Sequence, residues 1–146
     1  MKSKIIGFGI LLVLFSCKTY TISVDSFRNQ MTLEGNEKKY RKVEINNPLP
    51  YNYSNIKYFA TNIKRIIVQD KNGNDVVLQN SPKLEMRITR TNGKKYVLLF
   101  DTVIVENDTL KGARSRILQN LTREIPMDGI SVIEIQANGK VYKYQN

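Results

Sequence analysis

The sequence predicts a mainly β fold: an antiparallel small barrel or sandwich of about seven to nine short strands, preceded by a short N-terminal helix or extended segment. Three Asn-Gly pairs, at residues 72–73, 92–93 and 138–139, each separate two stretches rich in β-branched or aromatic residues. Such pairs favour β-hairpins. No interval with helical periodicity separates these stretches, which disfavours parallel βαβ packing. Barrel and sandwich are equally compatible with this pattern.

The chain starts with a short apolar segment behind two positive charges. Lys2 and Lys4 precede an apolar run at residues 5–15, which is shorter than the roughly 20 residues that a membrane-spanning helix needs. A basic start, a short apolar core and a small residue, Ser16, describe a secretory signal peptide. We therefore expect residues 1–16 to be removed from the mature protein.

The end of this segment, Leu14-Phe15-Ser16-Cys17, resembles the lipobox of bacterial lipoproteins, in which a branched apolar residue lies three positions before the cysteine. The resemblance implies that the Ser16–Cys17 bond is cleaved, that the Cys17 thiol receives diacylglycerol and that the new amino group is acylated, for example by palmitate. Two or three acyl chains anchor a protein stably, since each buried CH₂ adds about 0.8 kcal/mol. The alternatives are an ordinary signal peptide with a chance cysteine, or an uncleaved anchor. No second cysteine exists to form a disulfide with Cys17.

Residues 17–53 are expected to hold the lipidated cysteine, a polar tether at 18–23 and an N-terminal extension. Within the extension, Val24, Phe27 and Met31 recur at helical spacing, which favours a short helix over residues 23–33, although a strand is a close competitor. Two prolines at 48 and 50 exclude a helix or a central strand. We place the end of the extension there.

Residues 54–146 are expected to form the antiparallel β domain. Leu84, Met86 and Ile88 alternate with polar residues, as in a half-buried strand. The Asn-Gly pair at 92–93 predicts a type I′ turn, in which both central residues have positive φ. Beyond it, both faces of the strand at 96–100 are apolar, which indicates a central position. The remaining expected segments are strands at 63–69, 76–78, 101–106, 109–114, 131–136 and 140–144, turns at 71–74 and 107–108, and a strand end with one turn at 125–128.

Three stretches, LEMRIT, FDTVIVENDTLKG and IPMDGISVIEIQANGKVYKY, lie between residues 84 and 144. Together with the lipobox, they resemble a type of small lipoprotein from Bacteroidota with a β-rich domain, a D-T-x-x-x turn and a closing IP-x-x-x-I-x-x-IE strand. The resemblance implies a location and a fold, and no activity. Lipoproteins of this phylum that reach the cell surface tend to carry acidic residues directly after the cysteine. Here the first acid is Asp25, so we expect the protein to face the periplasm from the cell membrane or the outer membrane.

The phylum's O-glycosylation signal is Asp, then Ser or Thr, then a small or aliphatic residue. Asp101-Thr102-Val103 and Asp108-Thr109-Leu110 both fit it. Thr109, at an expected turn, is the better candidate, because Thr102 reads equally well as a buried strand residue.

The composition argues against most catalytic and cofactor chemistry. The chain has no histidine, no tryptophan and one cysteine, whereas Ser-His-Asp and Cys-His catalysis require an imidazole and zinc or haem sites need His or Cys ligands. We expect neither an enzyme nor a cofactor or metal. A carboxylate-based hydrolase or transferase, with Asp101 or Asp108, is the enzyme alternative; it requires two carboxyls that converge in one pocket.

The chain carries a net charge of +10, or +8 once Lys2 and Lys4 are removed, which suggests anionic partners. Export argues against nucleic acid and favours an anionic envelope polymer or another envelope protein. One basic patch is expected on the hairpin around residue 92, although such patches are more often merely solvated surfaces. Its members are Arg87, Arg90, Lys94 and Lys95.

Tyrosines gather at residues 51, 53 and 58 and again at 142 and 144. Such stripes stack on sugar rings or bases in some proteins, but in a small β domain they more often cover the core or form cross-strand pairs. The sequence thus predicts a lipid-anchored, non-enzymatic binding or interaction module of the cell envelope. The alternative is a structural accessory subunit of an envelope assembly or secretion machine.

Overall fold

The computed structural model describes residues 18–34, 37–45, 56–137 and 142–145. These form antiparallel sheets and one α-helix, so the expected mainly β fold with a short N-terminal helix is confirmed. The elements in chain order are β1 (Thr19–Ile22), α1 (Val24–Glu34), β2 (Lys38–Ile45), β3 (Ile56–Thr61), β4 (Arg65–Gln69), β5 (Asp75–Gln79), β6 (Leu84–Arg90), β7 (Lys95–Leu99), η1 (Phe100–Thr102), β8 (Ile104–Glu106), β9 (Thr109–Ala113), β10 (Thr122–Pro126), η2 (Met127–Gly129), β11 (Ile130–Ala137) and β12 (Tyr142–Gln145).

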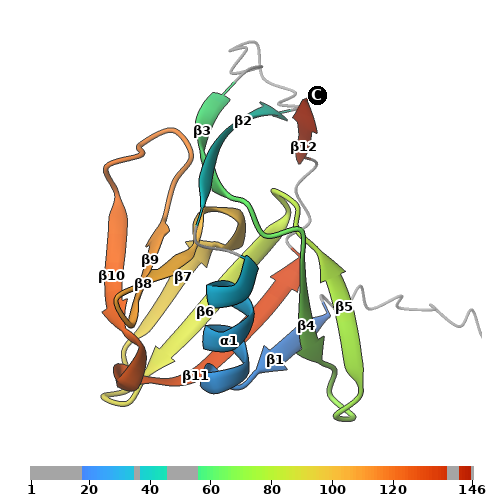
Figure 1. Cartoon of the computed structure of the whole chain (residues 1–146), viewed down its shortest axis with the longest axis vertical. Coiled ribbons are helices and arrows are strands. Elements are labelled where there is room, and N and C mark those ends of the chain that lie inside the picture. The colour runs from blue at the N-terminus through green and yellow to red at the C-terminus, as the bar shows by residue number, and fades with distance from the viewer. Residues whose placement is uncertain (1–17, 35–36, 46–55, 138–141, 146) are drawn as a thin grey trace, which may run out of the picture.

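Three sheets account for these strands (Figure 1). The large sheet has the order β5-β4-β1-β11-β6-β7, a second sheet has the order β10-β9-β8, and a third has the order β12-β2-β3. β7 is thus an edge strand, and the central position expected for residues 96–100 is wrong. All the pairings are antiparallel. Each sheet is open, with two edge strands, so the described residues form a layered, sandwich-like fold and not a closed barrel. Short strands such as β8 bring the count within residues 56–145 above the seven to nine expected.

The segment at residues 18–23, expected to be a tether, contributes a strand to the middle of the large sheet. β1 pairs with β11 along its length, with Tyr20 opposite Ile135 and Ile22 opposite Ile133, and it touches β4 at its other edge. Tyr20 and Ile22 alternate with exposed threonines and point into the core. Within the described residues, secondary structure therefore begins at residue 19.

The helix α1 forms where its apolar spacing predicts. Ser23 accepts a hydrogen bond at its side-chain oxygen from the Ser26 N–H, 3.2 Å away, which caps the first turn. Phe27 and Met31, one turn apart, are fully buried against the large sheet. Figure 1 shows α1 lying across one face of that sheet.

The turns differ from expectation in type. The Asn107-Asp108 pair has φ of 51° and 54°, the conformation of a type I′ turn. In the loop at residues 90–94 only Gly93 has positive φ, at 82°, so the expected type I′ turn there is wrong. The Gly93 N–H donates to the Arg90 carbonyl at 2.9 Å, and glycine takes the single left-handed position that closes the longer loop.

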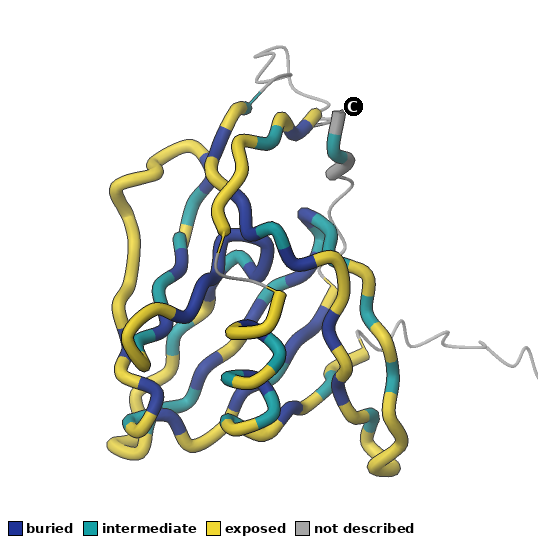
Figure 2. Tube along the Cα trace, viewed as in Figure 1, coloured by how far each residue is buried: buried dark blue, intermediate teal, exposed yellow. Residues whose placement is uncertain are grey.

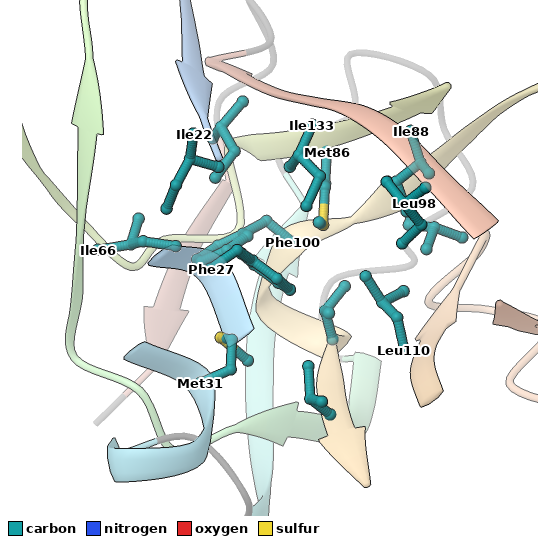
Figure 3. Close-up of a cluster of buried hydrophobic side chains, with 14 of the residues drawn as sticks. Ile22, Phe27, Met31, Ile66, Met86, Ile88, Leu98, Phe100, Leu110 and Ile133 are labelled. Atoms are coloured by element: carbon teal, nitrogen blue, oxygen red, sulfur yellow. The ribbon is translucent and has the colours of Figure 1, made fainter. Parts of the chain in front are cut away.

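The main core lies between the large sheet on one side and α1 with the β8–β10 sheet on the other. Fully buried side chains from both layers converge in Figure 3, among them Phe27, Met86, Phe100 and Ile133. Each contributes about 1.5–3 kcal/mol by leaving water. Exposed positions follow outer strands such as β5 and β10 (Figure 2).

The strand expected at residues 101–106 is interrupted. Residues 100–102 form the one-turn helix η1, closed by a hydrogen bond from the Val103 N–H to the Phe100 carbonyl at 3.0 Å, and β8 begins only at Ile104. The turn carries Asp101 into the interior, where it is fully buried. This placement produces the polar cluster described next.

Candidate functional site

A buried carboxylate, Asp101, is the centre of a polar cluster where the β2–β3–β12 sheet meets the rest of the molecule. The Arg116 Nη2 donates to its Oδ1 at 2.9 Å, and the Tyr144 hydroxyl donates to its Oδ2 at 3.0 Å. The Tyr58 hydroxyl also donates to Oδ2. Arg116 further donates to the Pro82 carbonyl at 2.7 Å. Both charged side chains are almost completely buried: Asp101 is 0% exposed and Arg116 is 7% exposed.

The electrostatics of the cluster keep the two tyrosines and Arg116 protonated. Burial is the larger cause that raises the pKa of both Tyr58 and Tyr144 above the ordinary range, and the negative charge of Asp101 raises it further. Burial alone would lower the pKa of Arg116, but Asp101 and Tyr58 outweigh it and leave the pKa raised. At neutral pH both tyrosines therefore remain donors and Arg116 remains charged.

The cluster joins four parts of the chain that are distant in sequence: β3, η1, the loop at residues 114–121 and β12. Tyr58 also belongs to a small second core with Val43 and Ala60, on the inner face of the β2–β3–β12 sheet. Because a buried charge needs a complete set of partners, Asp101 holds this sheet in one position. The geometry indicates a structural lock.

The two aspartates of the carboxylate alternative lie in different surroundings. Asp108 sits on the exposed type I′ turn and accepts a hydrogen bond from the Arg28 Nε at 2.7 Å. Asp101 is buried and bound by Arg116 and two tyrosines. Among the described residues, the two aspartates have no hydrogen-bonding partner in common.

A cavity of about 150 Å³ lies next to the cluster, between β3 and the β8–β10 sheet. Tyr58 and Thr102 line it next to the cluster, and the ion pair of Lys111 with Glu124 and polar groups of the 114–121 loop and β10 also line it. The Gln119 side chain donates to the Lys57 carbonyl at 2.8 Å and fixes the loop to β3. The lining residues used below are Lys38, Phe59, Ser115, Gln119 and Thr122.

The outer face of the β2–β3 pair, adjoining this cavity, is basic and aromatic. Tyr40 and Phe59 are directly opposed in the register, and their ring centroids lie 3.8 Å apart at a tilt of 34°. The Lys57 Nζ lies 4.7 Å from the Tyr40 ring centroid. Lys38 and Lys42 alternate with Tyr40 and so share its side of β2. We call these five exposed residues, Lys38, Tyr40, Lys42, Lys57 and Phe59, the lysine–aromatic face.

Sequence reasoning did not single out this face. The alternation of Lys38, Tyr40 and Lys42 was readable in the segment KKYRKVEI, but the pairing that adds Lys57 and Phe59 depends on strand register. Tyr58, in contrast, belongs to the core, as the commoner interpretation of the tyrosine cluster held. Tyr51 and Tyr53 lie outside the described residues.

The structure separates the residues of the expected basic patch. Arg87 and Lys95 point to the outer face of the large sheet, where Glu134 lies directly opposite Arg87 in the register. Arg90 is half-buried, and its guanidinium lies against Gly129. Lys94 is exposed in the turn. Arg87 and Lys95 thus share a surface that Arg90 does not join.

The two candidate glycosylation threonines differ in exposure. Thr102 is buried, and its hydroxyl donates to the Leu99 carbonyl at 2.7 Å and accepts from the Ala113 N–H at 2.9 Å. Thr109 is half-buried at the type I′ turn. Of the two, Thr109 offers the more accessible hydroxyl. The lipidation site Cys17 and the cleavage residue Ser16 lie outside the described residues.

Within the part of the chain that the structure describes, His, Cys, Asp and Glu side chains form no group of three that could hold a metal ion. None of the helices described there combines the length and apolarity needed to cross a bilayer. No model of a known protein family, no curated protein and no solved structure matches the chain.

Proposed function

We propose that this protein is a lipid-anchored module of the bacterial cell envelope that acts by binding an anionic partner and not by catalysis. The observation that carries the proposal is the position of β1, which begins at Thr19, two residues after Cys17, and is held between β4 and β11. A lipid on Cys17 would therefore hold the whole domain against the membrane surface, facing the periplasm, without a flexible linker.

The surface chemistry supports a binding role. The lysine–aromatic face presents three ammonium groups beside two exposed rings, and the mature chain carries a net charge of +8 once Lys2 and Lys4 are removed. Such a surface attracts anions. The buried carboxylate Asp101 already has three hydrogen-bonding partners, which supports a structural role for that residue.

The second candidate function is an accessory subunit of an envelope assembly or secretion machine. It is favoured by three large apolar side chains on or next to the 114–121 loop: Ile117, Leu118 and Leu121 are 58%, 55% and 43% exposed. An exposed apolar cluster of this kind is typical of a protein–protein contact. Cross-linking in cells would trap one dominant protein partner at this loop if the second function holds, and many weak partners would contradict it.

The anchor is tested by the mass of the N-terminal peptide from detergent-extracted protein, expressed in a bacterium that processes lipoproteins. The wild type should give a peptide that begins at Cys17 and carries two or three acyl chains. The Cys17→Ser chain should not carry them and should leave the membrane fraction. An unmodified wild-type peptide, or one that begins elsewhere, would refute the lipid anchor.

A further inference from the structure

We propose that the lysine–aromatic face and the cavity beside it bind an anionic polysaccharide, with one sugar residue in the cavity and its neighbours on the face. This inference deepens the binding half of the proposed function and does not depend on lipidation of Cys17. Three observations carry it: the charge of the face, its exposed rings, and the size and lining of the cavity.

The charge of the face is available to a ligand. Lys38, Lys42 and Lys57 form no ion pair with any carboxylate among the described side chains. Glu44 is the one described acid on the same side of β2 and β3, which leaves a net positive face. Exposed ammonium groups that are not paired with a carboxylate attract anionic groups, and added salt screens the attraction.

The rings give the face a second kind of contact. Tyr40 is 57% exposed and Phe59 is 44% exposed, although most large apolar side chains of this fold are buried. The two rings stack on each other at a centroid distance of 3.8 Å, and the Lys57 Nζ lies over the Tyr40 ring, so their apolar platform is the ring surface that these contacts leave exposed. A pyranose ring matches such a platform, because one of its faces carries C–H groups while its hydroxyl and acid groups project from the rim toward the lysines.

The cavity extends the platform. Lys38 and Phe59 belong to both the face and the cavity wall, so the two surfaces are continuous. At about 150 Å³ the cavity is smaller than the roughly 300–1,000 Å³ typical of sites that enclose a small-molecule ligand. Ser115, Gln119 and Thr122 supply hydroxyl and amide groups suited to sugar hydroxyls. A space of this size suits one residue of a longer chain.

The position of the face is compatible with an anchor at the N-terminus. Figure 1 shows the β2–β3–β12 sheet at one end of the molecule, whereas β1, where the described chain begins, lies in the body below it. A partner reaching the lysine–aromatic face therefore meets a surface apart from the start of the fold.

The test measures binding of fluorescent polymers to the full chain in a nonionic detergent. Polygalacturonate supplies carboxylated sugars, dextran sulfate supplies sulfated sugars and dextran is the neutral control. Poly-L-glutamate is a polyanion without sugar rings, and oligo-dT is a polyanion with bases. We expect at least one anionic sugar polymer to bind at least tenfold more tightly than dextran, poly-L-glutamate and oligo-dT, and its affinity to fall as salt rises.

Variants locate the site. Tyr40→Leu and Phe59→Leu keep apolar bulk but remove the ring, and each should weaken binding about tenfold, equivalent to about 1.4 kcal/mol. Lys57→Gln should weaken it at least threefold. The matched control Lys95→Gln removes the same charge from the outer face of the large sheet and should change affinity less than twofold. Circular dichroism checks that each variant is folded. If a leucine variant is unfolded, the affinity of Lys57→Gln compared with that of Lys95→Gln tests the location of the site.

Several results would overturn the inference. Binding to neither anionic sugar polymer would exclude the ligand class. Equal affinity for poly-L-glutamate, or tightest binding to oligo-dT, would show that charge alone or a nucleic acid is recognised. Equal losses of affinity in Lys57→Gln and Lys95→Gln would exclude the lysine–aromatic face as the binding site. An unmodified N-terminal peptide with intact sugar binding would refute the lipid anchor and leave this inference standing.

Discussion

Replacing Asp101 with asparagine tests whether the buried cluster is a structural lock. The substitution conserves shape but removes the negative charge 2.9 Å from the Arg116 Nη2, where both side chains are buried. Breaking a buried ion pair by removing one partner costs about 3–5 kcal/mol, because the other charge loses its compensation. A domain of ordinary stability, about 5–15 kcal/mol, would lose a large part of its free energy of unfolding.

The structure places Asp101→Asn near the lower end of this range. Asparagine keeps one carbonyl oxygen, which can still accept from one of the two tyrosine hydroxyls, and a neutral hydrogen bond recovers about 0.5–1.5 kcal/mol. We therefore expect a loss of about 3 kcal/mol. Asp128→Asn is the matched control, because Asp128 is exposed on η2; exposed substitutions of this kind usually stay within about 0.5 kcal/mol.

Urea unfolding of the full chain measures the free energy of unfolding of Asp101→Asn and of Asp128→Asn. The comparison requires that the free energy falls with urea concentration at the same slope in all variants. A third variant, Asp101→Asn with Arg116→Met, removes the uncompensated charge as well and should be more stable than Asp101→Asn alone. A loss below 1 kcal/mol for Asp101→Asn, or an equal loss for Asp128→Asn, would refute the structural lock. So would a double variant less stable than Asp101→Asn.

Three further substitutions test the fold. The pKa of Tyr58 and Tyr144 is raised by burial and by Asp101, so the unfolded chain releases these protons first as the pH rises above about 10. Stability should fall there with a slope that approaches about 1.4 kcal/mol per pH unit per tyrosine, and Tyr58→Phe should reduce the slope of urea midpoints between pH 10 and 11. Gly112→Ala would place a Cβ 2.9 Å from the Val103 Cγ2, and thermal unfolding should report a loss of about 1–3 kcal/mol from overpacking. Asn107→Val forces a β-branched residue to φ 51° and should cost at least about 1–2 kcal/mol by the same assay, whereas Asn107→Gly should be nearly neutral.

Local patterns predicted the local structure of this fold. The spacing of Phe27 and Met31 located α1, and the alternation around Met86 located β6, because each pattern depends only on neighbouring residues. β1 was missed because it has four residues and its main partner, β11, lies more than a hundred positions later in the chain. Its burial arises from that distant pairing.

The same limit applies to the site. Asp101 stands in the apolar segment FDTVIV. A charged residue in a buried segment indicates that another residue pairs with it, but nothing in the neighbouring sequence identifies Arg116 or Tyr144 as that residue. The lysine–aromatic face likewise depends on the register that places Phe59 opposite Tyr40. Where a property depends on which distant strands meet, composition and spacing restrict the candidates without selecting among them.

The buried cluster and the lysine–aromatic face lie on opposite sides of the same strand. On β3, Tyr58 points inward to Asp101, while Lys57 and Phe59 point outward. The Gln119 side chain fixes the backbone of this strand from the cavity side. Because a strand alternates its side chains between two faces, fixing Tyr58 also fixes the two outer residues beside it. A preorganised surface loses less entropy when it binds. If the lysine–aromatic face binds the proposed polysaccharide, the buried ion pair, whose burial has a desolvation cost, also serves binding by holding that face in shape.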